Sequence, residues 1–239
     1  MPLLEAEGVS KRFGGFVALN EVDLHLNAGE RLGLIGPNGS GKTTLINCIS
    51  GALFSDGGRI LFDGRDVTRL PAFQRARLGI ARSFQIPRPF RTMSVIDNLK
   101  IPLEFAASER LNGADIHGEA MAILELIGLA EKAHASSAGL TQIEMRKLDL
   151  GRAMAAKPSL LVSDEAMAGL SSSEVDEILE VLMKLNATGV AVIMIEHIMR
   201  AVMRFSERVV VLDAGAKIAE GPPEAIVKNP DVERAYLGV

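Results

Sequence analysis

Nine consecutive residues carry the strongest chemical signal in this chain of 239 residues. They fit the phosphate-binding loop pattern G-x-x-x-x-G-K-[S/T] and are, in order, Gly36, Pro37, Asn38, Gly39, Ser40, Gly41, Lys42, Thr43 and Thr44. The three glycines let the backbone curl so that successive N–H groups point at phosphate oxygens. Lys42 would reach the β- and γ-phosphates, and the Thr43 hydroxyl would bind Mg²⁺. The sequence therefore predicts a binding site for a nucleoside triphosphate.

The segments on either side of this loop support the same interpretation. Residues 32–35 form a short apolar strand candidate, and residues 44–49 form a plausible helix. A phosphate group at the start of that helix would also meet the positive end of the helix dipole. The alternative is an ordinary glycine-rich turn before a helix. The Lys-Thr pair and the strand–loop–helix context favour phosphate binding.

Two adjacent carboxylates follow a predicted buried strand further along the chain. Residues 160–165 read Leu-Leu-Val-Ser-Asp-Glu, so an apolar run ends at Asp164 and Glu165. Asp164 would hold Mg²⁺ directly or through water. Glu165 could polarise the attacking water as a general base. The alternative is an acidic strand end that is only solvated, but a position downstream of a phosphate-binding loop favours catalysis.

Three further side chains could complete such a site, although each alone has an ordinary explanation. His197 ends a predicted strand and could contact the γ-phosphate and hold the water or the base, whereas a lone histidine there is usually structural. Gln85 is a neutral amide that could bond both the metal shell and the water. Phe13 could stack on an adenine ring, although taken singly it is more typical of a core residue.

The N-terminal part of the chain has the pattern of antiparallel strands. Residues 22–26 alternate apolar and polar side chains, and residues 58–62 lead into Asp63-Gly64, a hairpin signal. Residues 87–158 are mainly helical in pattern. Within them, residues 116–127 predict an amphipathic helix that ends near Gly128.

The C-terminal part has the pattern of a parallel sheet. Residues 160–162 and 190–195 are continuous apolar runs, as expected for strands buried on both faces. Between them, apolar residues recur at helical spacing after the serines at 171–173, which offer an N-cap. This predicts a β-α-β unit. A further strand at 208–212, a turn and a helical tail follow.

The composition limits the class of protein. Apolar residues make up 48 % of the chain, which is enough for a sizeable core, and the net charge of −4 gives no basic field for nucleic acid. The single Cys48 excludes an intrachain disulfide and fits a reducing cytosol. Residues 1–5 lack the features of a signal peptide, and the most apolar run, at 190–195, is far too short to span a bilayer.

Taken together and in this order, these residues resemble the nucleotide-binding subunit of an ABC transporter over essentially the whole chain. The resemblance rests on Phe13, the phosphate loop, Gln85, a helical insertion, Asp164-Glu165 and His197. Segments 12–15, 79–85, 97–99, 196–197, 218–224 and 235–238 look most like the ATP-binding subunits of branched-chain amino acid importers. Related systems for urea, amides or aromatic acids share these segments.

The resemblance implies a fold, a reaction and a set of partners. It implies an α/β phosphate-loop ATPase with a mostly parallel central sheet, an antiparallel side sheet and a helical insertion. The chain would be one ABC ATPase domain, with residues 1–86 and 159–239 as nucleotide-binding core and 87–158 as helical subdomain. It implies ATP and Mg²⁺ as ligands and a dimer, of identical or homologous subunits, that sandwiches two ATP molecules. The dimer would work on membrane permease subunits at the cytoplasmic face, and indirectly with a solute-binding protein.

One segment departs from the family pattern. The signature Leu-Ser-Gly-Gly-Gln, which binds ATP across the dimer, is replaced by Leu140, Thr141, Gln142, Ile143 and Glu144. The lost glycines restrict the approach of the backbone to a phosphate, and a carboxylate near an anion should weaken binding. Thr-x-x-Glu is also a capping box, in which Glu144 turns back to the Thr141 N–H. We favour the capping box, which leaves helix N–H groups free for an anion.

Three functions are compatible with these residues. The leading hypothesis is a motor that hydrolyses ATP to drive import of a small solute, such as a branched-chain amino acid. An exporter of the lipopolysaccharide-transport type and a soluble ABC-type ATPase acting on nucleic acid or ribosomes are alternatives. The acidic net charge and the lack of coiled-coil heptads argue against the last of these. Residues 86–92, rich in Pro, Phe and Arg, could dock a membrane partner or be a simple loop.

Overall fold

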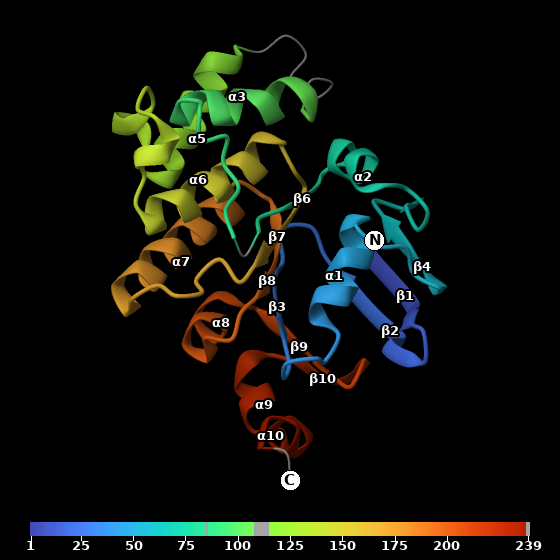
Figure 1. Cartoon of the computed structure of the whole chain (residues 1–239). Coiled ribbons are helices and arrows are strands. Elements are labelled where there is room, and N and C mark those ends of the chain that lie inside the picture. The colour runs from blue at the N-terminus through green and yellow to red at the C-terminus, as the bar shows by residue number, and fades with distance from the viewer. Residues whose placement is uncertain (85, 108–114, 238–239) are drawn as a thin grey trace.

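The computed structural model describes residues 1–84, 86–107 and 115–237, and these form an α/β structure built on two sheets (Figure 1). Within the described residues, one sheet has the strand order β10-β9-β3-β8-β7-β6 and the other the order β2-β1-β4-β5. The first sheet consists of β3 (Arg31–Ile35), β6 (Ile80–Arg82), β7 (Leu160–Asp164), β8 (Ala191–Ile195), β9 (Arg208–Asp213) and β10 (Ala216–Gly221). The second consists of β1 (Leu4–Phe13), β2 (Phe16–Leu26), β4 (Gly57–Phe62) and β5 (Arg65–Asp66).

The first sheet is parallel except for its last strand, as the sequence predicted. β3 pairs with β8 and β9, and β7 pairs with β6 and β8, all in parallel, whereas β10 pairs with β9 in antiparallel. Every residue of β7 and β8 is buried, because both faces of these strands are covered. The carboxyl ends of β3, β6, β7 and β8 therefore lie at one edge of the sheet.

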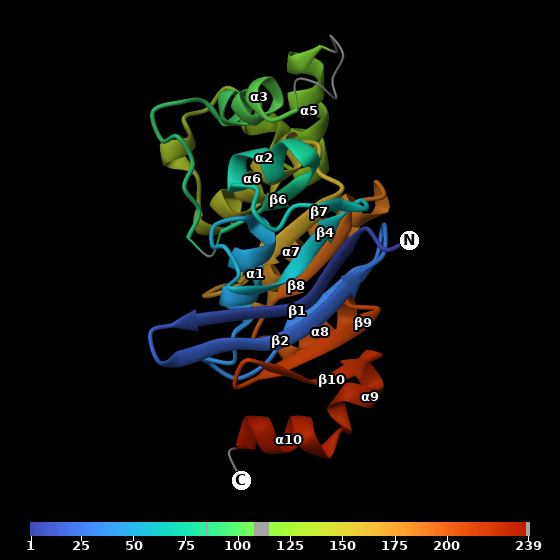
Figure 2. The ribbon, with the colours of Figure 1, turned by 90° about the vertical axis from the view of Figure 1, so that its right-hand side faces the viewer.

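The second sheet is antiparallel throughout, and its alternating pattern puts Val22, Leu24 and Leu26 inside. The predicted hairpin joins β4 to β5 through Asp63 and Gly64. Helix α1 (Lys42–Ser50) lies between the two sheets (Figures 1 and 2) and shares one apolar core with both. Cys48 is a buried member of that core, as expected for a small apolar side chain.

Several helices gather beyond the β6 edge of the parallel sheet, at the top of Figure 1. They are α3 (Val95–Phe105), α5 (Ile116–Ile127) and α6 (Gln142–Ala155), with the short 3₁₀ turns η1 (Ala130–Lys132) and η2 (Ser137–Gly139). The predicted helix at 116–127 ends at Gly128, whose positive φ of 73° closes it. Helix α7 (Ser172–Ala187) joins β7 to β8 and begins at a capping box formed by Ser171 and Glu174.

The remaining helices flank the sheets. α2 (Ala72–Leu78) precedes β6, and α8 (Met199–Phe205) precedes β9. The tail consists of α9 (Pro223–Val227) and α10 (Pro230–Leu237), at the opposite end from α3 (Figure 1). Among the described residues no helix is both long enough and apolar enough to cross a membrane.

A buried arginine, which the sequence did not single out, stabilises the end of α1. Arg75 on α2 is 0 % exposed. Its guanidinium donates to the carbonyls of Cys48 (2.6 Å) and Ile49 (2.8 Å) on α1, and to those of Leu70 (2.8 Å) and Thr68 (3.0 Å). The carbonyls at a helix C-terminus lack partners within the helix and carry partial negative charge, so a cation is favourable there.

Candidate nucleotide-binding and hydrolysis site

The phosphate-binding loop joins β3 to α1, in the strand–loop–helix arrangement that the motif requires. Gly36, Gly39 and Gly41 have φ angles of 151°, 81° and 104°. A side chain at Gly36 would lie 2.1 Å from the Leu212 carbonyl oxygen, and one at Gly41 would lie 2.7 Å from the carbonyl oxygen of Ala18. Glycine is therefore needed at Gly36 and Gly41 both for the backbone conformation and for the close packing of the loop.

The ammonium group of Lys42 lies inside this loop. Its Nζ donates to the carbonyls of Gly36 (2.8 Å) and Pro37 (2.9 Å) and lies 3.4 Å from the Ser40 hydroxyl. Burial lowers the pKa of Lys42, while the nearby carboxylates of Glu165 and Asp164 act in the opposite direction. The loop thus holds a cation among inward-facing backbone groups, which fits a polyphosphate.

One cavity of about 230 Å³ brings together most of the residues that the sequence indicated. The loop residues Asn38, Gly39, Ser40, Gly41, Lys42, Thr43 and Thr44 line it together with Phe13, Phe16, Ala18, Glu165 and His197. These residues come from β1, β2, the loop, α1 and the ends of β7 and β8. The loop, the carboxylate and the histidine face one space, in which a bound phosphate could meet all three.

Phe13 stands at the mouth of this cavity and is not a core residue. Its side chain is 48 % exposed, and Phe16, which pairs with it across the β1–β2 turn, is 62 % exposed. Exposed aromatic rings beside a phosphate loop are suited to stacking on a flat base. Phe16 was not identified as a site residue from the sequence. The segment Phe-Gly-Gly-Phe at residues 13–16 could have indicated it, because a two-glycine turn places both rings at the end of one hairpin.

Glu165 and His197 are in direct contact. His197 Nε2 lies 3.0 Å from Glu165 Oε1. β7 and β8 are parallel neighbours, so residues that follow them meet at the same sheet edge. Glu165 has a φ of 48°, which is unusual for a non-glycine residue, and its N–H donates to the Ile195 carbonyl at 2.9 Å. The pair can receive a proton from a water molecule in the cavity.

Asp164 is paired with an arginine that the sequence reasoning missed. Its Oδ2 lies 2.6 Å from Nη2 of Arg82 at the end of β6, and Arg82 Nη1 lies 2.6 Å from Asn47 Oδ1 on α1. Asp164 does not line the cavity, whereas Thr43 does. A hydroxyl and a carboxylate beside the phosphate loop are the hard oxygen donors that suit Mg²⁺. The feature of the sequence that could have indicated Arg82 is its position as a basic residue at the end of β6, the strand that pairs with β7.

Gln85, the third predicted metal and water ligand, lies outside the described residues. Its neighbour Phe84 is described, and the Phe84 side chain is 51 % exposed. The guanidinium carbon of Arg82, two residues before Phe84, lies 5.6 Å from the centre of the Phe84 ring.

The segment 140–144 adopts the predicted capping box and lies outside the cavity. The Glu144 N–H donates to the Thr141 hydroxyl (3.4 Å), and the Thr141 N–H donates to Glu144 Oε2 (3.0 Å). Glu144 also pairs with Lys132 at 2.5 Å, and these bonds lower the pKa of Glu144. Thr141 and Gln142 are exposed, and neither they nor Ile143 and Glu144 line the cavity of this chain.

A second carboxylate, Glu196, lies buried behind Glu165. It is 2 % exposed, and its Oε1 accepts a hydrogen bond from the Met167 N–H at 2.9 Å. Burial raises the pKa of Glu196 to about 7, and the nearby Glu165 adds to this rise. The sequence shows Glu196 only as the residue before His197, and its burial depends on how the loop after β7 folds over it.

Two family models match parts of this chain. Residues 19–168 match the family model described as "ABC transporter", and residues 216–239 match the one described as "Branched-chain amino acid ATP-binding cassette transporter". The chain is 40 % identical to the high-affinity branched-chain amino acid transport ATP-binding protein LivG of Escherichia coli (strain K12), over 99 % of this chain and 98 % of LivG. It is 38 % identical to BraF of Pseudomonas aeruginosa, with the same coverage.

Solved structures show the same fold. The ADP conformation of MJ1267, an ATP-binding cassette of an ABC transporter, matches with a TM-score of 0.89 and 32 % identity over the whole of both chains. A nucleotide-free ATP-binding cassette from an ABC transporter matches with a TM-score of 0.88 and 32 % identity, again over the whole of both chains. The two-sheet α/β fold thus agrees with the sequence comparison, and the chain belongs to the ABC transporter family as an ATP-binding ATPase subunit.

Proposed function

We propose that this chain is the motor subunit of an ABC importer that takes up branched-chain or chemically related amino acids. The observation that carries the proposal is the cavity in which the phosphate loop, Glu165 and His197 meet. The importer branch and the substrate class are supported by identity to LivG and BraF over nearly the whole chain. An exporter or a nucleic-acid-dependent ATPase has no comparable support, and the chain carries a net charge of −4.

We propose the following division of roles within the site. Residues 36–44, with the Lys42 ammonium, bind the phosphates of ATP, and Phe13 stacks on the adenine. Thr43, Asp164 and Gln85 hold Mg²⁺, which when bound neutralises the charge on the β- and γ-phosphates. Glu165 accepts the proton of the attacking water. His197 contacts the γ-phosphate and holds Glu165 in position. The 3.0 Å contact between His197 and Glu165 supports this last assignment.

We propose that the active form is a dimer in which segment 140–144 of one subunit completes the site of the other. Residues 1–86 and 159–239 would form the nucleotide-binding core, and residues 87–158 the helical subdomain that carries the segment. The N-terminus of α6 supports this, because Thr141 and Gln142 are exposed there and a helix N-terminus favours an anion. In cells the dimer would lie on the cytoplasmic face of the membrane with its permease subunits, and a solute-binding protein would deliver the substrate.

Light scattering on Glu165→Gln tests this proposal directly. The variant should retain ATP without hydrolysing it, so with Mg·ATP we expect the mass to rise from 25.6 kDa to about twice that value. With ADP the same sample should remain a monomer. A monomer that binds ATP tightly would mean that a different ATPase subunit supplies the second half. A chain that binds no ATP would contradict the proposed function.

The docking site for the permease is proposed at the groove beside residues 86–92. This groove, of about 370 Å³, is lined by Ile86, Pro87, Arg91, Leu140, Gln142, Met145 and Arg146. The Ile86 side chain is 70 % exposed and that of Phe90 is 42 % exposed. An exposed apolar surface with a basic rim suits a short helix of a membrane subunit that has apolar and acidic residues. The groove lies between the segment after β6 and the start of α6.

Replacing Phe90 and Arg91 together with Ala should weaken assembly with the permease by at least about tenfold and leave ATP affinity nearly unchanged. Co-purification with the permease and titration with a fluorescent ATP analogue measure the two effects. The matched control is Phe54→Ala with Arg59→Ala, because both residues are exposed and they lie just before β4 and on β4 respectively. Loss of nucleotide binding in the Phe90/Arg91 variant would argue that these residues support the fold rather than the partner.

A further inference from the structure

Two buried charged residues of α6 hold the two segments that follow the neighbouring parallel strands β6 and β7. Asp149, which is 6 % exposed, accepts hydrogen bonds from the Phe84 N–H (2.8 Å) and from the backbone N–H of Arg88. Arg146, which is 7 % exposed, donates from Nη1 to the Phe84 carbonyl (3.5 Å) and from Nη2 to the Ala168 carbonyl (3.2 Å). One helix therefore binds the segment after β6 and the loop after β7 at the same time.

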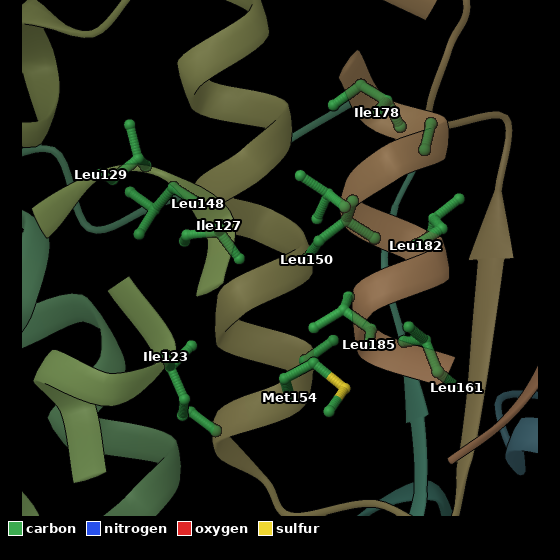
Figure 3. Close-up of a cluster of buried hydrophobic side chains, with 14 of the residues drawn as sticks. Ile123, Ile127, Leu129, Leu148, Leu150, Met154, Leu161, Ile178, Leu182 and Leu185 are labelled. Atoms are coloured by element: carbon green, nitrogen blue, oxygen red, sulfur yellow. The ribbon is translucent and has the colours of Figure 1, made fainter. Parts of the chain in front are cut away.

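The helix that carries these residues is firmly packed. Leu148, Leu150 and Met154 are buried, and Figure 3 shows α6 between α5 and α7, with side chains from both helices directed at it. A close-packed helix moves as a unit, because its side chains cannot shift independently of their neighbours. Arg146 and Asp149 are three residues apart, so they lie on the same face of α6. That face meets the two segments rather than the apolar core.

The loop after β7 is held at two adjacent residues by two different elements. The Met167 N–H donates to Glu196 at the end of β8, and the Ala168 carbonyl accepts from Arg146 on α6. The carboxyl of Glu196 and the guanidinium of Arg146 also attract each other. Because Glu165 begins this loop in a left-handed conformation, with φ of 48°, its position depends on how the loop is held.

The segment after β6 is held by the same helix. It runs from Phe84 past Arg88 to the groove proposed for the permease, which Ile86 and Arg91 line. Further along α6, Arg152 donates to the Arg88 carbonyl at 2.6 Å, so a third side chain of α6 holds the same segment. Charge-assisted hydrogen bonds of this kind are stronger than neutral ones and lose strength steeply when geometry is poor.

We propose that Arg146 and Asp149 are positioning residues that couple Phe84 and residues 86–88, and the loop carrying Glu165, to α6, whose N-cap is Thr141. A partner that moves residues 86–88 then moves α6 and the catalytic loop with them. The coupling rests on the proposed function, in which Glu165 is the general base and the groove beside residues 86–92 binds the permease. The coupling identifies Arg146 and Asp149 as the side chains through which a partner bound in the groove affects Glu165.

Hydrogen exchange of the whole chain tests the coupling without ATP hydrolysis. Asp149→Asn removes the charge that holds the backbone of Phe84 and Arg88, and both of these residues lie outside the loop after Glu165. We expect amide exchange to become about tenfold faster both in residues 86–91 and in residues 166–170. Lys147→Met is the matched control, because Lys147 lies on the same helix and pairs with the half-exposed Glu177. Faster exchange confined to residues 86–91 would overturn the proposal.

Steady-state kinetics of a second variant separate positioning from binding. Arg146→Met keeps the aliphatic stem but removes the bonds to the Phe84 and Ala168 carbonyls, so we expect kcat to fall by about tenfold or more while KM for ATP stays within about twofold. Wild-type kcat in this variant would overturn the coupling but leave the proposed function intact. Absence of ATP hydrolysis by the wild-type chain assembled with its partner subunits would contradict the proposed function instead, and the exchange experiment would still decide the coupling.

Discussion

Replacing Glu165 with Gln is expected to lower kcat for ATP hydrolysis by about 10²- to 10⁴-fold, the range for loss of a general base. Glutamine keeps the shape of the side chain and can still bond His197, whose Nε2 lies 3.0 Å from Oε1 in the native chain. It cannot take a proton from water. Because the phosphate loop is untouched, affinity for ATP should change little. Phosphate release and titration with a fluorescent ATP analogue measure the two quantities.

We expect this effect to be specific to Glu165 and not to follow from the loss of a negative charge elsewhere. Glu174→Gln provides the control, since Glu174 is a partly exposed carboxylate nine residues further on and glutamine also functions in a capping box. Its kcat should match that of the native chain. If Glu165→Gln hydrolysed ATP at the native rate, the water would have to be activated by another group, and the role assigned to Glu165 would be wrong.

Replacing Arg75 with Met is expected to lower the free energy of unfolding by about 3–5 kcal/mol, a loss typical of breaking a buried charged network. Burial lowers the pKa of Arg75 to about 10, so the group remains charged at neutral pH. Its guanidinium satisfies carbonyls of Cys48, Ile49, Leu70 and Thr68, which would be left buried without these bonds. For a chain of this size the melting temperature should fall by about 6–20 °C.

Urea denaturation and thermal melting check this expectation. Arg77→Met, at an exposed position on the same helix, is the matched control and should change stability by less than about 1 kcal/mol. Nucleotide affinity should fall with Arg75→Met only as the folded fraction falls, unless the end of α1 also positions the loop at its start. Equal stability of the two variants would show that the bonds of Arg75 to α1 contribute little.

Local sequence determined much of this protein. The conformation of the phosphate loop follows from glycines at fixed spacing. The buried strands β7 and β8 follow from continuous apolar runs, and the starts of α6 and α7 follow from capping boxes at Thr141 and Ser171. Each of these features is decided by residues within a few positions of one another. Once β7 and β8 are parallel neighbours, the meeting of Glu165 and His197 at one sheet edge also follows.

The tertiary structure alone decided the rest. Arg82 pairs with Asp164, 82 residues away, and Arg75 reaches carbonyls of α1 that lie 26 and 27 residues earlier. Phe13 is exposed at the site rather than buried in the core, and Glu196 is buried because the loop after β7 covers it. These outcomes depend on which distant elements pack together. Burial and charge pairing are properties of that packing, and no local pattern in the sequence specifies them.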